Sequence, residues 1–193
     1  MPAILISTED AKSSRHYFSA IARSVRRRLL VDIAPSSGSS PLNVLNDAKR
    51  HVARSRHGEY RDVWVVFDTE GRDSPRQVSG QVRSSVERAR QLGYRTAISN
   101  PAFEFWCLLH FEWSTEPFAN ASRVESRLRQ HLQDYVKGGD YDLFRVLRDS
   151  TDLAVERAGR LRRERHADVA DVCERVPGTE VDLLVSELRP LWD

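Results

Sequence analysis

The chain has 193 residues, of which 40% are apolar and 30% charged, and these proportions are typical of a water-soluble globular protein. No run approaches the ~20 apolar residues of a membrane span, and the first ten residues lack the basic region of a signal peptide. We therefore expect a cytoplasmic protein with no membrane partner. The two cysteines, Cys107 and Cys173, lie in helical patterns without metal-ligand spacing and are expected to be reduced, buried side chains.

The formal net charge of +2 hides an uneven distribution. Residues 1–113 carry 17 basic and 12 acidic groups, a difference of +5, whereas residues 114–193 carry 13 and 16, a difference of −3. This imbalance is compatible with a phosphate-rich partner but is too small to establish one. Only three of the 30 basic residues are lysines, at positions 12, 49 and 137. A lysine in so arginine-rich a chain either marks a site that needs a compact ammonium group or persists by chance.

Strands and helices alternate in the first hundred residues. Short apolar runs predict strands at residues 3–7, 29–34, 63–67 and 94–98. Serines at a helix start, prolines at first helical positions and apolar residues at helical spacing predict intervening helices from residue 13 or 14, from 41 to about 56, and from 75 to 92. This alternation predicts an α/β fold with a mainly parallel sheet flanked by helices, in which ligands bind at the carboxyl ends of the strands.

The pattern becomes mainly helical after Pro101. Helices are predicted over residues 102–113, 120–136, 141–147 and 152–166, and from 179 to about 188. The sequence therefore predicts an α/β core over residues 1–113 and a mainly α-helical C-terminal extension over 114–193 that packs on the core. The apolar helix at 102–113 would suit a homo-oligomer interface if it were not buried internally.

Two carboxylates follow the most apolar predicted strand. In VWVVFDTEG, Asp68 and Glu70 come directly after five apolar residues. Side chains two residues apart share a face of an extended chain, so a turn can bring both onto one divalent cation. Mg²⁺ or Mn²⁺ suits such hard oxygen ligands, and Mg²⁺ commonly takes one or two carboxylates and keeps several waters. The alternative is a solvated acidic turn, which the spacing alone favours.

Glu9 and Lys12 follow the first predicted strand. Glu9 alone is typical of an acid near a helix start. Together with Asp68 and Glu70 it would place three mutually repelling carboxylates at one sheet edge, where a bound cation is expected. Lys12 either offsets this charge and holds a phosphate, or is an ordinary surface lysine.

Glu104 stands near the start of a helix that is otherwise almost entirely apolar. It is either a first-turn acid or a buried carboxylate that needs a partner, a metal or a proton. We expect it to point to the same pocket as Glu9, directly or through a partner such as Asn100. His110, on the same stripe as Phe103, is expected to be a core imidazole. No catalytic Ser/His/Asp or Cys/His arrangement and no glycine-rich phosphate loop is recognisable.

Several stretches resemble the RloB-like family, a branch of the Toprim-like superfamily. The most specific is AISNPAFEFWCLLHFE, and the others are AILISTEDAKSSRHYF, SGSSPLNVLNDAKR, VWVVFDTEG, DYVKGGDYDLFRVL and PGTEVDLLVSEL. The resemblance spans nearly the whole chain and implies a Toprim/Rossmann-like sheet. The chain departs from the family pattern at Asp10, where glycine is usual, and at Glu70, where aspartate is usual.

The resemblance implies roles for the candidate residues. Toprim domains use the glutamate after the first strand as general acid/base and a later acidic pair as Mg²⁺ ligands. Catalytic roles therefore fall to Glu9, Lys12 and Glu104, and metal binding to Asp68, Glu70 and Glu9. Candidate nucleic-acid-binding residues are Arg15, Arg26, Arg72, Asn100 and Lys137.

The expected activity is that of a Mg²⁺-dependent nuclease acting on DNA or RNA. RloB-like proteins are associated with restriction loci, so the resemblance also implies antiviral defence and a defence-system partner protein. The alternative is a Toprim-like module that binds a nucleotide or a protein without cleavage.

Overall fold

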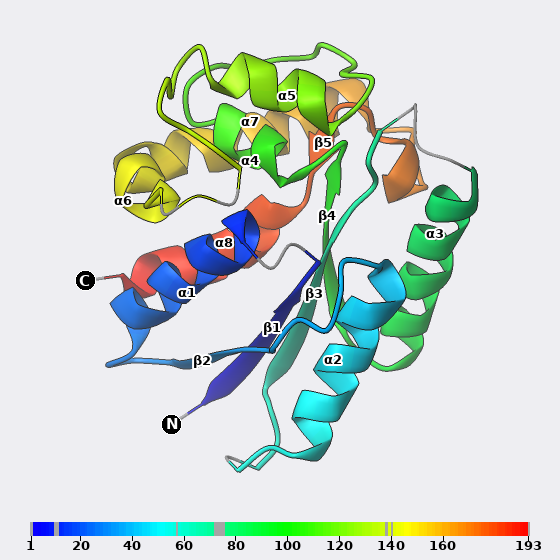
Figure 1. Ribbon diagram of the computed structural model, residues 1–193, viewed down its shortest axis with the longest axis vertical. Coiled ribbons are helices and arrows are strands. Elements are labelled where there is room, and N and C mark those ends of the chain that lie inside the picture. The colour runs from blue at the N-terminus through cyan, green and yellow to red at the C-terminus, as the bar shows by residue number, and fades with distance from the viewer. Residues whose placement is uncertain are drawn as a thin grey trace.

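One twisted sheet runs through the middle of the computed structural model, which describes residues 2–9, 12–56, 58–71, 76–137, 139 and 141–192 (Figure 1). In the described part of the chain the sheet has five strands in the order β2-β1-β3-β4-β5. Their bounds are Ala3–Thr8 (β1), Leu30–Ile33 (β2), Asp62–Asp68 (β3), Arg95–Asn100 (β4) and Gly178–Thr179 (β5). β1 to β4 are parallel, and β5 pairs antiparallel with β4.

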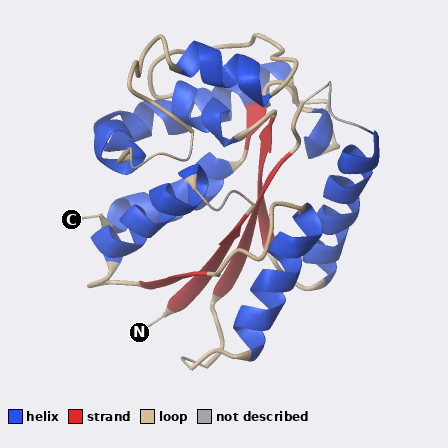
Figure 2. Cartoon of the chain, in the orientation of Figure 1, coloured by secondary structure: helices blue, strands red, loops and turns tan. Residues whose placement is uncertain are grey.

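Helices cover both faces of this sheet (Figure 2). α2 and α3 lie on one side, α1 and α8 lie on the other, and α4 to α7 gather beyond the carboxyl ends of the strands (Figure 1). Their bounds are Ser13–Val25 (α1), Pro41–Ala53 (α2), Arg76–Gln91 (α3), Phe103–Leu108 (α4), Ala121–Leu128 (α5), Leu143–Leu147 (α6), Thr151–Arg165 (α7) and Val181–Leu188 (α8). The described residues also form three short 3₁₀ helices, η1 (Arg148–Ser150), η2 (Val172–Glu174) and η3 (Arg189–Leu191).

Alternate side chains of the strands divide the buried apolar residues into two clusters. In β3, Trp64 and Val66 belong to the first cluster, which lies against α1, α4 and α8, whereas Val65 and Phe67 belong to the second, against α2 and α3. This division follows from the period of two along a strand. The predicted α/β fold, with a mainly parallel sheet flanked by helices, is confirmed.

The first cluster joins the two parts of the chain. It contains Ile4 and Ile21 from the front half, and Leu128, Val185 and Trp192 from the back half. Residues 114–192 thus pack on residues 1–113 through a shared core and also supply β5. All six residues of α4 are buried, so this helix lies inside the molecule rather than on a surface where a second copy could bind.

Three local predictions were wrong. The helix predicted over 120–136 ends at Leu128, and the helix predicted over 102–113 ends at Leu108. The last helix, predicted from residue 179, begins at Val181, and Gly178 and Thr179 form β5. In the described residues no helix has both the length and the apolar character needed to cross a membrane. Both cysteines are free thiols; Cys107 is buried and Cys173 is half-buried.

β2 forms one edge of the described sheet. Its third residue, Asp32, accepts a hydrogen bond from the Tyr60 hydroxyl, and the Asp32 carboxylate lies 3.7 Å from His51 Nε2. A charged side chain therefore stands in the middle of the edge strand and is held there by two neighbours.

Candidate active site

Glu9 and Asp68 meet at the carboxyl edge of the sheet. β1 and β3 are adjacent and parallel, with Thr8 opposite Val66, so the residues that follow them emerge side by side. The Glu9 backbone N–H donates to the Val66 carbonyl (3.2 Å), and the Asp68 backbone N–H donates to Glu9 Oε2 (3.0 Å). The Glu9 carboxylate is therefore fixed against the end of β3.

The Asp68 carboxyl group lies in a place that disfavours its negative charge. Asp68 is only 7% exposed. Burial raises the pKa of Asp68 well above its usual value, and the charges of Glu104 and Glu9 raise it further, while Lys137 acts in the opposite direction. Glu70 makes the smallest of these contributions to the pKa. A cation beside Asp68 would relieve this electrostatic cost.

Glu104 is the most deeply buried acid of this edge, at 1% exposure in the first turn of α4. The Tyr135 hydroxyl donates a hydrogen bond of 2.9 Å to Glu104 Oε1, and Lys137 Nζ lies 3.4 Å from the same oxygen. Glu104 Oε2 is buried and has no hydrogen-bond partner among the described residues. The predicted partner Asn100 was wrong, because Asn100 donates from Nδ2 to the Cys173 carbonyl (2.8 Å) and the hydrogen-bond partner of Glu104 is Tyr135.

Tyr135 and Ser13 are site residues that the sequence did not indicate. The Ser13 hydroxyl lies 3.1 Å from the Tyr135 hydroxyl. Because Tyr135 donates its single proton to Glu104, Ser13 is the donor to the tyrosine oxygen. Burial and the charge of Glu104 raise the pKa of Tyr135, so its hydroxyl stays protonated as a donor. Residue 135 falls within the helix predicted over 120–136, and this prediction gave no sign that the tyrosine would turn to Glu104.

The loop after β3 places Glu70 differently from Asp68. Glu70 is exposed and has a positive φ of 62°, a conformation uncommon outside glycine. Its backbone N–H donates to the Pro101 carbonyl (2.8 Å), and the Thr69 N–H donates to the Ser99 carbonyl (3.0 Å). The loop is therefore tied to the end of β4, with the Glu70 side chain at the surface beside the buried Asp68.

The remaining candidates are dispersed. Lys12 is exposed and immediately precedes α1, at the same edge as Glu9. Arg15, in the first turn of α1, donates to the Ala34 carbonyl (2.6 Å) and also lies near this edge. Arg26 lies just past the other end of α1, about 20 Å along the helix axis. Arg72 and Asp10 lie outside the described residues.

The donor set suits Mg²⁺ or Mn²⁺, because carboxylate oxygens are the ligands that these ions prefer. The described residues contain no group of three or more His, Cys, Asp or Glu side chains arranged to hold a metal ion. One oxygen of Glu9 already accepts the Asp68 N–H. The arrangement therefore fits an ion held by one or two carboxylates, with water or a substrate phosphate as the remaining ligands.

The model of a family described as RloB-like protein matches residues 4–188, nearly the full length of the chain. A search of curated proteins gave no match, and neither did a search of solved structures.

Proposed function

Because the chain belongs to the RloB-like family, we propose that it is a metal-dependent nuclease of the Toprim type, which cleaves phosphodiester bonds of DNA or RNA with Mg²⁺ or Mn²⁺. The proposal includes a role in antiviral defence, a cytoplasmic location and a defence-system partner protein. The observation that carries it is the junction of Glu9, Asp68 and Glu104 at the carboxyl edge of a parallel sheet, where α/β proteins bind their ligands.

Asp68 and Glu70 would hold the cation, with Glu9 beside them. The raised pKa of Asp68 supports this assignment, since a buried carboxylate near two other acids is stabilised by positive charge. When bound, Mg²⁺ supplies Lewis-acid polarisation of the phosphate and stabilises the leaving oxygen.

Glu9 is the proposed general acid/base. Its carboxylate is fixed by the Asp68 N–H, and it is only half-buried, so that a nucleophile or leaving group can reach it. It would take a proton from the attacking water or give one to the leaving oxygen. Arg15 and Lys12, at the start of α1, would contact phosphates of the nucleic acid without reading its bases.

A binding module without cleavage is the second candidate. It is favoured by the lack of a three-ligand cluster among the described residues and by the pairing of Glu104 with Lys137, which supplies positive charge without a metal. Such a protein would hold a nucleotide or a partner at the same edge and leave its phosphodiester bonds intact.

The two candidates are separated by incubating the purified protein with plasmid DNA, single-stranded DNA and tRNA, each with Mg²⁺, Mn²⁺ or EDTA. The nuclease is expected to cleave at least one of these substrates with a divalent ion and none with EDTA. Asp68→Asn, purified in parallel, controls for a contaminating nuclease and is expected to be inactive. No cleavage by the wild-type protein, together with no thermal shift on adding Mg²⁺, would favour the binding module.

A further inference from the structure

Lys137 supplies positive charge to a site that holds several acids. Its Nζ is 3.4 Å from Glu104 Oε1, and it is the one cationic side chain among the causes that shift the pKa of Asp68 in the described site. In that role it opposes the charges of Glu104, Glu9 and Glu70. Lys137 thus supplies, beside Glu104, part of the positive charge that a divalent cation would bring to this edge.

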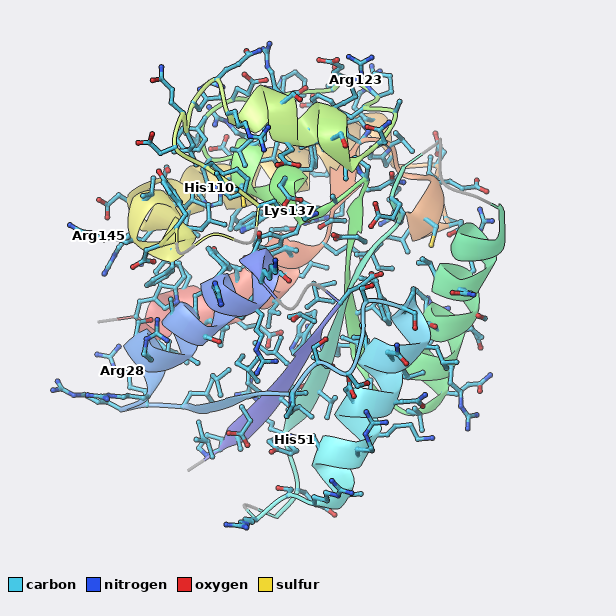
Figure 3. All side chains as sticks on the ribbon, viewed as in Figure 1. Arg28, His51, His110, Arg123, Lys137 and Arg145 are labelled. Carbon is cyan, nitrogen blue, oxygen red and sulfur yellow. The ribbon has the colours of Figure 1, made fainter. Side chains whose placement is uncertain are left out.

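Tyr135 and Lys137 reach Glu104 in different ways. Tyr135 is 1% exposed and its hydroxyl contacts both Ser13 and Glu104, so it anchors the segment after α5. The Lys137 side chain is 36% exposed, and the intervening Val136 is 60% exposed. In Figure 3, Lys137 lies where α4 approaches the first turn of α1. The four-carbon stem of Lys137 is flexible and partly exposed. Its ammonium group can therefore move from Glu104 to another partner while Tyr135 stays in place.

We propose that Lys137 is the counter-charge of Glu104 when no divalent cation is present, and that it turns to a phosphate of the nucleic acid when a cation binds. The inference rests on the proposed function and adds to it a phosphate-contacting residue and an order of binding, cation before nucleic acid.

The reason is electrostatic. Lys137 pairs with Glu104, whereas the proposed cation is held by Asp68 and Glu70 at the same edge. Two positive groups at one edge repel each other, so binding of either weakens binding of the other. Once displaced from Glu104, the Lys137 ammonium has a phosphate oxygen as its natural partner, and a compact ammonium with three donors suits a single phosphate. In a chain with 27 arginines and three lysines, an ammonium at this position is consistent with that role.

The test compares Lys137→Met with the wild-type protein by thermal melts over a Mg²⁺ titration, without nucleic acid. Removing the ammonium is expected to lower the melting temperature without Mg²⁺, because buried Glu104 keeps its hydrogen bond from Tyr135 but loses its positively charged neighbour. It is also expected to lower the half-maximal Mg²⁺ concentration about 3- to 10-fold, because the competitor is gone. A merely structural lysine would leave that concentration unchanged or raise it.

Two variants serve as controls. Lys137→Arg keeps the charge and is expected to keep a half-maximal Mg²⁺ concentration close to that of the wild type. Lys49→Met removes an exposed lysine of α2, on the other face of the sheet, and is expected to change neither the metal-free melting temperature nor the Mg²⁺ dependence.

Binding of a labelled single strand is measured in a Glu9→Gln background with saturating Mg²⁺. Lys137→Met is expected to weaken binding and to reduce the slope of log K against log salt by about 0.7, the value for one lost phosphate contact. An unchanged slope, an unchanged half-maximal Mg²⁺ concentration, or a wild-type protein without any Mg²⁺ response would overturn the inference.

Failure of the inference is distinguishable from failure of the proposed function. If the wild-type protein cleaves nucleic acid but Lys137→Met binds Mg²⁺ no more tightly than the wild type, the nuclease proposal is supported and the inference about Lys137 is wrong. If the wild-type protein does not cleave, but Lys137→Met shows both the lower half-maximal Mg²⁺ concentration and the smaller salt slope, the nuclease proposal is wrong and the inference about Lys137 is supported.

Discussion

The carboxyl group of Asp68 shares a buried edge with Glu9 and Glu104, and its raised pKa reflects the cost of that position. Asp68→Asn keeps the shape, removes one negative charge and relieves this repulsion. We expect the metal-free variant to melt at the same or a higher temperature than the wild type. Cleavage should fall by at least about 100-fold, as for loss of a group that stabilises transition-state charge. Thermal melts and a cleavage assay measure both effects.

Glu9→Gln provides the contrast with Asp68→Asn. If Glu9 moves protons rather than binding the ion, the variant loses cleavage but keeps most of the Mg²⁺-induced thermal shift, which Asp68→Asn loses. Equal loss of the thermal shift in both variants would make Glu9 a metal ligand, and a destabilised metal-free Asp68→Asn would contradict the repulsion argument.

His110 is a buried neutral imidazole, as its position on the apolar stripe predicts. Its Nδ1 lies 3.0 Å from the Trp106 carbonyl and donates to it, whereas Nε2 is buried with no partner among the described residues. Burial lowers the pKa of His110 to about 4. A group whose pKa is lower in the folded than in the unfolded state stabilises the fold fully above its unfolded pKa, which is about 6.5 for histidine.

This stabilisation is lost as the pH falls from about 6.5 toward 4. We expect wild-type stability to drop by about 3 kcal/mol more than that of His110→Phe across this window, since each pKa unit corresponds to about 1.4 kcal/mol. Urea unfolding of both proteins at pH 7 and near pH 4 gives the double difference, in which the packing cost of the phenylalanine cancels. Equal pH dependence in the two proteins would mean that His110 is protonated in the fold.

The site residues divide into those that local sequence predicts and those that it does not. Glu9 and Asp68 follow apolar runs, so the rule for parallel strands places both at one edge. Tyr135 reaches Glu104 and Ser13 only through the tertiary fold, across 122 residues in the case of Ser13. No spacing rule relates such positions in a single sequence, and the Glu104 partner could not be predicted.

At the scale of elements, the loop after β3 is fitted closely against the start of α5. Gly71 has a positive φ of 87°, and a Cβ there would overlap the Ala119 carbonyl. Gly71→Ala is expected to lower the free energy of unfolding by about 1–3 kcal/mol through strain and overpacking. It is also expected to reduce cleavage, because the displaced loop carries Glu70. Denaturant unfolding and the cleavage assay measure the two effects.

Gly80 is the matched control for Gly71. It lies within α3, and an added Cβ there meets no atom within 4 Å. Gly80→Ala is therefore expected to raise the free energy of unfolding by about 0.5–1 kcal/mol through helix propensity, with cleavage unchanged. A Gly71→Ala protein as stable as the wild type would show that the loop can move away from α5 at no cost.

The elements that were predicted wrongly from the sequence depend on contacts between residues far apart in the chain. β5 has two residues and follows a proline, so its local sequence resembles a turn; it becomes a strand because β4 offers an edge to pair with. α4 is buried on all sides, and its apolar run continues past Leu108, so the pattern did not mark where the helix ends. The strands and helices of the first hundred residues were predictable because apolar runs and helical apolar spacing alternate there and most are bounded by capping or turn residues.

At the scale of the whole molecule, the shared first cluster makes the two parts of the chain depend on each other. A fragment of residues 1–113 would expose the α1 and α4 side of the sheet, including Trp106 and Phe18, to water. We expect the full chain to unfold in one transition and the fragment to show no cooperative transition. Thermal melts followed by far-UV circular dichroism test this expectation.

Mixing the fragment with residues 114–193 is the complementary experiment. Recovery of a cooperative melt on mixing would show that the missing partner surface was the cause. A fragment that melts cooperatively alone would instead identify residues 1–113 as an independent domain.

The unequal edges of the sheet affect how the protein behaves at high concentration. In the described sheet β5 is the edge strand beyond β4, and it has only two residues, paired with Ser99 and Asn100. β2 is the opposite edge strand, has four residues and pairs with β1, so it is the longer edge to which a strand of another molecule could add. Asp32 stands in the middle of β2. If the β2 strands of two molecules paired, two aspartate side chains would come close together with less water around them, and their repulsion would oppose the pairing. We therefore expect this one side chain, held by Tyr60 and His51, to disfavour strand-to-strand association through β2.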